Sequence, residues 1–144
     1  MSLYTIGFTK TSAESFFGRL QRAGVRRVID VRLNNVSQLA GFAKRDDLRY
    51  FLAEIGGIGY EHRLDLAPTP VVLDAYRKEH SGFATFEQSF LALITERKVE
   101  TVFSREDLEG ACLLCSEASA EHCHRRVAAE YLQHHLGGFE IVHL

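Results

Sequence analysis

A short stretch of the chain, residues 115–126, concentrates side chains that can do chemistry. Cys115 ends an apolar run, and Cys123, His124 and Arg125 follow it after an intervening segment that contains Glu117. A thiol near a helix N-terminus has a lowered pKa, because free backbone N–H groups and the helix dipole favour the thiolate. Histidine exchanges protons near neutral pH, and arginine grips phosphate or carboxylate groups through paired hydrogen bonds. The segment therefore predicts thiol chemistry on an anionic group, with catalytic candidates Cys115, Glu117, Cys123 and His124 and with Arg125 binding the anion.

Two other segments are expected to reach the same place. Asp30-Val31-Arg32 puts Arg32 just past one predicted strand, and Gly7-Phe8-Thr9 follows another. In open α/β sheets, ligands bind beyond the carboxyl ends of the strands, often at a helix N-terminus. If these strands lie beside the run that ends at Cys115, then Arg32, Gly7 and Thr9 are further candidates for binding the anion. The glycine would let the backbone approach a ligand closely.

The elements that must position these residues follow from hydrophobic spacing. Short apolar runs predict strands at 3–6, 28–31, 58–62, 111–115 and 139–143. Helical spacing predicts one helix between Ser12 and Gly24, a second that starts at Asp46 or Asp47 and stops at Gly56, and others at 71–79, 85–97 and 120–136. Residues 98–109 fit either a strand at 99–103 or a helix at 104–108, and residues 32–44 form a polar loop. Strands that alternate with helices predict a single α/β domain, residues 1–144, with a mostly parallel sheet flanked by helices.

Length and composition limit the classes of function that the protein can have. The chain has 144 residues, 46% of them hydrophobic, with 17 basic and 19 acidic side chains, so the net charge is −2. This balance disfavours a protein that holds DNA through an extensive basic face. The first residues lack the basic and apolar regions of a signal peptide, and no apolar run is long enough to span a bilayer, so we expect a cytoplasmic protein with reduced thiols.

Several of these signals have a second interpretation. Cys112 and Cys115 match a C-x-x-C pattern, but successive residues of a strand face opposite ways, so residues three apart lie on opposite faces. We therefore expect Cys112 to be a core residue and not to share a metal with Cys115. Zinc held by cysteine and histidine of residues 115–124 stays an alternative, although the spacing fits no common zinc pattern; we predict no metal and no cofactor. Glu117 can pair with an arginine instead of acting as an acid or base, and Arg32 can be a surface residue.

Five blocks of the sequence carry a family resemblance. They are Thr5-Ile6-Gly7-Phe8, Asp30-Val31-Arg32, Tyr60-Glu61-His62, Leu114-Cys115-Ser116-Glu117 and Cys123-His124-Arg125. In this order, and with the closing Val142-His143-Leu144, the chain resembles the DUF488 family of uncharacterised bacterial and archaeal proteins. The resemblance implies an α/β fold and marks Arg32, Cys115, Glu117, Cys123, His124 and Arg125 as family motif positions. It implies no reaction.

The sequence departs from the family pattern in two places. Asn34-Asn35-Val36-Ser37-Gln38 stands where many members have a proline followed by Ser-Arg, and Leu66-Ala67-Pro68-Thr69 stands where many have Leu-Gly-Gly. These differences indicate a distinct branch of the family.

Two functions fit these observations. The first is a small enzyme that acts on an anionic substrate that carries phosphate, such as a nucleotide or a nucleic-acid end. The alternative is a non-catalytic module that binds nucleic acid or a protein through the loop 34–44 and the basic residues Arg45, Arg49, Arg125 and Arg126. The net charge favours the enzyme.

Overall fold

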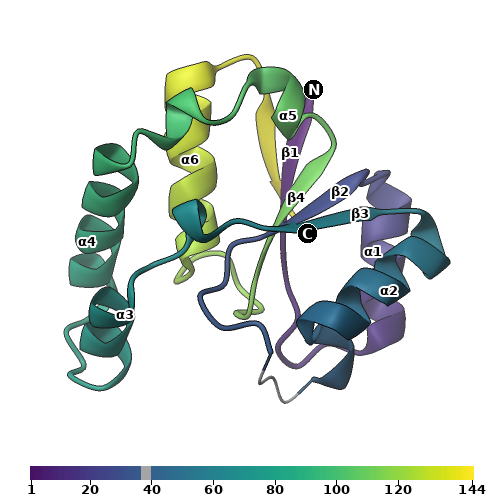
Figure 1. Ribbon diagram of the computed structural model, residues 1–144, viewed down its shortest axis with the longest axis horizontal. Coiled ribbons are helices and arrows are strands. Elements are labelled where there is room, and N and C mark those ends of the chain that lie inside the picture. Colours follow the sequence, from purple (N-terminus) through teal and green to yellow (C-terminus); the bar gives the residue numbers. More distant parts are fainter. Residues whose placement is uncertain (37–39) are drawn as a thin grey trace.

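The computed structural model describes residues 1–36 and 40–144, which form a parallel five-stranded sheet with helices on both faces (Figure 1). The strand order is β3-β2-β4-β1-β5. The strands are β1 (Ser2–Gly7), β2 (Arg27–Asp30), β3 (Gly59–His62), β4 (Ala111–Cys115) and β5 (Glu140–His143). The predicted α/β class and parallel sheet are confirmed.

The register of the sheet brings the chemically active segments to one edge. β4 lies between β2 and β1, with Asp30 opposite Leu114 and Gly7 opposite Cys115. All five residues of β4 are buried, as expected for a central strand covered on both faces. The ends of β1, β2 and β4 therefore meet, as the sequence predicted.

Two helical layers cover the sheet. The helices are α1 (Ala13–Ala23), α2 (Arg45–Gly56), α3 (Pro70–Arg77), α4 (Phe83–Glu96), α5 (Arg105–Leu108) and α6 (His124–Leu136). Short 3-10 helices span Gly41–Ala43, Leu64–Leu66 and Val99–Thr101. Helices α1 and α2 cover one face, whereas α6, backed by α4 and α3, covers the other (Figure 1). Each face buries its own apolar cluster, because successive strand residues alternate between them.

The helix ends follow their predicted signals in α1. The Ser12 hydroxyl accepts a hydrogen bond from the Ser15 N–H, and Gly24 ends the helix in the left-handed conformation that suits glycine. Among the described residues, no helix combines the length and the apolar character that crossing a membrane requires.

For residues 98–109 the sequence left a strand at 99–103 or a helix at 104–108, and the helix is confirmed as α5, capped by Ser104, after a 3-10 turn at Val99–Thr101. One other predicted helix starts too early. The helix predicted at 120–136 begins only at His124, because Cys123 has an extended backbone and caps the helix. This later start places Cys123 and His124 at the helix N-terminus. Residues 37–39 of the predicted polar loop lie outside the described residues.

Candidate active site

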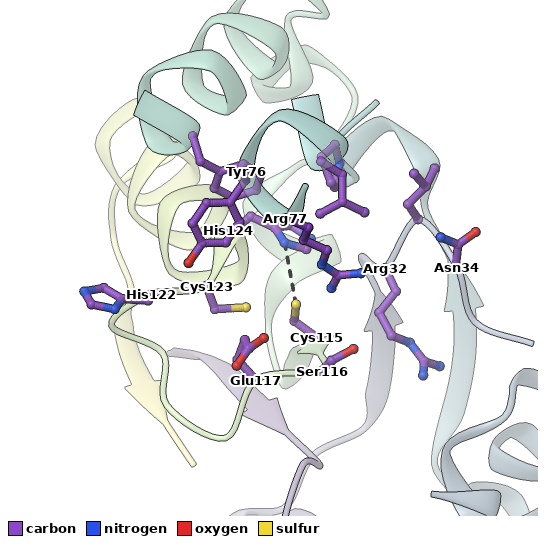
Figure 2. Close-up of a pocket in the computed structure, with 14 residues that line it drawn as sticks. Arg32, Asn34, Tyr76, Arg77, Cys115, Ser116, Glu117, His122, Cys123 and His124 are labelled. Carbon is purple, nitrogen blue, oxygen red and sulfur yellow. Dashed lines mark hydrogen bonds between the residues drawn. The ribbon is translucent and has the colours of Figure 1, made fainter. Parts of the chain in front are cut away.

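A cavity of about 400 Å³ opens at the carboxyl ends of β2 and β4. The loop after β2, helices α3 and α4, the loop after β4 and the start of α6 all contribute walls (Figure 2). Its polar and sulfur-bearing lining residues are Arg32, Asn34, Tyr76, Arg77, Cys115, Ser116, Glu117, His122, Cys123 and His124. Its other lining residues are Leu33, Pro68, Leu73 and Phe86. All four predicted catalytic residues and Arg32 thus line the same cavity.

Cys115 and His124 form a pair at the wall of this cavity. The Cys115 Sγ lies 3.5 Å from the His124 Nδ1, and the His124 Nε2 lies 2.7 Å from the carbonyl oxygen of Val31. A carbonyl can only accept, so the Nε2 atom carries a proton and donates it. In the neutral ring, Nδ1 is then free to accept the proton of the Cys115 thiol. This is the arrangement of a nucleophile, a base and a third group that orients the base.

The surroundings of Cys115 favour its ionised form. A hydrogen bond from the Cys123 thiol lowers the pKa of Cys115 most, and the charge of Arg125 and the backbone N–H groups of Ser116 and Glu117 lower it further. Burial acts in the opposite direction but does not outweigh them. The Cys115 thiol is therefore more readily ionised than an ordinary cysteine thiol.

Cys123 has the opposite tendency. Burial raises its pKa, and so do the hydrogen bond to Cys115 and the negative charge that Cys115 carries when ionised. Only 2% of Cys123 is exposed, against 6% of Cys115. The two thiols thus form an unequal pair, in which Cys115 ionises first and Cys123 keeps its proton.

Arg125 lies apart from the cavity that it was predicted to serve. Only 1% of it is exposed, its Nε donates to the Thr5 hydroxyl, and its two terminal nitrogens donate to the carbonyl oxygens of Glu117 and Ala118. No carboxylate pairs with it among residues 1–36 and 40–144. Its contacts hold the loop after β4 in place, and its charge stabilises the Cys115 thiolate.

Gly7 and Thr9 also contact this loop and do not line the cavity. The Thr9 hydroxyl donates to the Ser116 carbonyl at 2.6 Å. A Cβ atom on Gly7 would stand 1.6 Å from the Glu117 carbonyl oxygen. Gly7 therefore allows β1 to approach the loop after β4 closely, and not a ligand as predicted.

Arg32 is anchored on the acidic end of β2. Its Nε and Nη2 each donate to a different oxygen of Asp30 at 2.8 Å, in a pair that is almost completely buried. The Tyr60 hydroxyl donates to the same carboxylate at 2.6 Å. The Nη1 atom of Arg32 is buried and has no hydrogen-bond partner within the described part of the chain. Figure 2 shows the Arg32 side chain directed away from the two sulfur atoms, and its guanidinium carbon lies 5.2 Å from the centre of the Phe8 ring. The guanidinium therefore holds the end of β2 and does not face the sulfurs.

The sequence interpretation missed a second cation. Arg77, at the end of α3, is exposed and lines the cavity, yet no motif or strand end marks it. Beside it, the rings of Tyr76 and Phe86 stack with their centroids 4.9 Å apart and line the same cavity. Only the packing of α3 against α4 shows that these residues belong to the site.

Glu117 and His122 occupy exposed positions of the loop after β4. Glu117 lines the cavity and is free of the arginine pairing that the sequence left open, since its contact with Arg125 uses the backbone carbonyl. Figure 2 shows His122 turned away from the two sulfur atoms. Its ring packs on Phe83 instead.

Most of the basic residues of the alternative surface, predicted to bind nucleic acid or a protein, already form ion pairs or are buried. Arg45 pairs with Asp46, and Arg126 pairs with Glu87 and Glu130. Arg125 is buried, as described above. Their charges are therefore partly neutralised or hidden.

Cys115, Cys123 and His124 also meet a geometric requirement for metal binding, since their ligand atoms all lie within 4.8 Å of one another. A zinc ion there would itself remove the protons of both thiols on binding, so the raised pKa of the Cys123 thiol does not decide against it. The absence of a resident metal stays a prediction.

Comparison with known proteins gives one result. Neither the curated proteins nor the solved structures yield a match. The family described as "Domain of unknown function DUF488" matches residues 12–132. This span includes β2, β4, most of α6 and every residue that lines the cavity. The chain therefore belongs to the DUF488 family.

Proposed function

We propose that this protein is an enzyme that attacks an anionic, phosphate-bearing substrate with the thiolate of Cys115. The observation that carries the proposal is the Cys115–His124 pair, 3.5 Å apart, beside a cavity that the exposed Arg77 lines. His124 takes the thiol proton, and the Val31 carbonyl holds its ring in the required tautomer. Cys123 supports the thiolate through a hydrogen bond.

The substrate is bound by the cation that faces the cavity from an exposed position, Arg77. The guanidinium of Arg32 stays with Asp30 and supports the end of β2 in this proposal. Glu117 lies where it can exchange a proton with a leaving group. The cavity volume suits a small molecule, and the Tyr76 and Phe86 rings offer an apolar surface for a flat group such as a nucleobase. Arg125 has a positioning role in this proposal.

Alkylation of Cys115 by two reagents tests the proposal. Iodoacetate is an anion and iodoacetamide is neutral, so the ratio of their rates reports whether the site attracts negative charge. We expect Cys115 to prefer iodoacetate more strongly than free cysteine does. Arg77→Ala should lower the preference roughly fivefold, because one unit charge in contact through water contributes about 1 kcal/mol. Salt should weaken it.

Two variants complete the test. Lys78→Ala removes the neighbouring cation, which pairs with Asp74 and does not line the cavity, and should leave the ratio unchanged. His124→Ala should slow both reagents by about tenfold or more, because the base is lost. Mass mapping of the labelled peptides identifies the cysteine in each case. Equal slow labelling of all three cysteines, or a ratio no higher than that of free cysteine, would refute the proposal.

A further inference from the structure

The sulfur atoms of Cys115 and Cys123 are close enough to react with each other. They lie within 4.8 Å, and Figure 2 shows them turned toward one another at the cavity wall. A disulfide needs about 2 Å between the sulfurs, with Cβ atoms about 4 Å apart. Rotation of the two side chains can close much of such a gap. Cys112 cannot take part, because it packs in the apolar cluster on the opposite face of the sheet.

Both cysteines stand at the ends of their elements. Cys115 ends β4, and Cys123 precedes the first residue of α6, where its thiol bonds to Cys115 and His124 and does not cap the helix. The residues between them form turns and bends whose later part, 119–122, is mostly exposed. Both thiols line the cavity, so a small oxidant can reach them although little of either residue is exposed to bulk solvent.

We propose that Cys115 and Cys123 form a reversible disulfide when the protein meets a peroxide, and that this disulfide switches off the thiol chemistry of the site. The inference rests on the proposed function for its regulatory meaning, since the sulfur consumed is the proposed nucleophile. The bond also protects Cys115 from irreversible oxidation.

The chemistry balances in two steps. The Cys115 thiolate attacks one peroxide oxygen, the O–O bond breaks, and the other oxygen leaves as water after taking up a proton, so that Cys115 becomes a sulfenic acid. The Cys123 sulfur then attacks the Cys115 sulfur, the S–O bond breaks, and the departing hydroxide takes the Cys123 proton and leaves as water. Two thiols have lost two electrons, and the peroxide has been reduced to water. A dithiol reductant reverses the bond.

Oxidation of the 144-residue protein with equimolar hydrogen peroxide tests the proposal. In the wild type, the free thiols should fall from three to one, and peptide mapping should recover a fragment that links Cys115 to Cys123. Dithiothreitol should restore all three. The matched control Cys112→Ala should form the same link, since this cysteine is sealed in the core. In Cys123→Ser, dimedone should trap Cys115 as a sulfenic acid, and without dimedone an excess of peroxide should oxidise Cys115 irreversibly.

Three outcomes would overturn the proposal. They are a wild type that keeps three free thiols, a link that involves Cys112, and a near-stoichiometric transition metal that is retained after purification and blocks the link. Failure of the proposed function is separate, because the iodoacetate preference is measured on the reduced protein. A disulfide without that preference would leave a peroxide-sensitive thiol pair but remove the anion-directed enzyme.

Discussion

Asp30→Ala should lower the free energy of unfolding by about 3–5 kcal/mol, as expected when one partner of a buried ion pair is removed. The Asp30 carboxylate is fully buried and accepts from the Arg32 backbone and guanidinium, from Tyr60 and from Asn35. Loss of the carboxylate leaves the Arg32 guanidinium buried without a counter-charge, since only 3% of Arg32 is exposed. Urea unfolding at neutral pH measures the effect.

Tyr60→Phe is the matched control, because it removes one hydrogen bond to the same carboxylate and keeps the ion pair. We expect a smaller loss of about 1.5–3 kcal/mol. A loss below about 1 kcal/mol in Asp30→Ala would contradict the view that the pair is sealed from water.

The same carboxylate predicts how stability changes with pH. Burial tends to raise the pKa of Asp30, but the hydrogen bonds and charge of Arg32, with help from Tyr60, hold it below its ordinary value of 3.8. The folded state then binds the proton less readily than the unfolded state does, so the stabilisation is complete above about pH 4. It is lost as the pH falls through the folded-state pKa. The stability difference between wild type and Asp30→Asn should be constant from neutral pH down to that range and shrink below it.

Gly7→Ala should lower the free energy of unfolding by about 3 kcal/mol or more, because the added methyl group overlaps backbone that cannot move freely. The new Cβ would lie 1.6 Å from the Glu117 carbonyl oxygen and 2.9 Å from Nη1 of Arg125. That oxygen is held in place by the Arg125 guanidinium. The loop must shift, and the backbone N–H groups that support the Cys115 thiolate shift with it.

Gly41→Ala provides the comparison for Gly7→Ala, since a Cβ at Gly41 meets nothing within 4 Å. Its stability should stay within about 0.5 kcal/mol of the wild type. Thermal unfolding measures both variants, and the rate of Cys115 alkylation should fall only in Gly7→Ala. Equal stability of the two variants would show that the loop after β4 is not fixed against β1.

Local sequence signals were enough to predict the sheet and the edge at which the site lies. A buried apolar run ending at Cys115 and a short run ending at Asp30 place their carboxyl ends together once the strands are parallel neighbours. The alternation of strand residues also separated Cys112 from Cys115 correctly.

The same local sequence signals could not predict the directions of individual side chains. Arg125 and His124 are adjacent at the start of α6, yet the His124 ring faces Cys115 and the Arg125 guanidinium faces Thr5. The direction of each side chain depends on where α6 begins. Because the backbone of Cys123 is extended, α6 begins at His124 and not at the predicted residue 120. Arg77 reaches the site through the packing of α3, a contact between distant parts of the chain that no local pattern encodes.

The two halves of the loop after β4 differ in how well they tolerate amino-acid substitutions. Its first residues are tied to the Arg125 guanidinium through the Glu117 and Ala118 carbonyls, so a replacement there must reproduce two backbone directions. Residues 119–122 carry no such tie to Arg125, and Ser119, Glu121 and His122 are exposed. Substitutions in the second half can therefore change the rim of the cavity at His122 while the backbone beside Cys115 keeps its position.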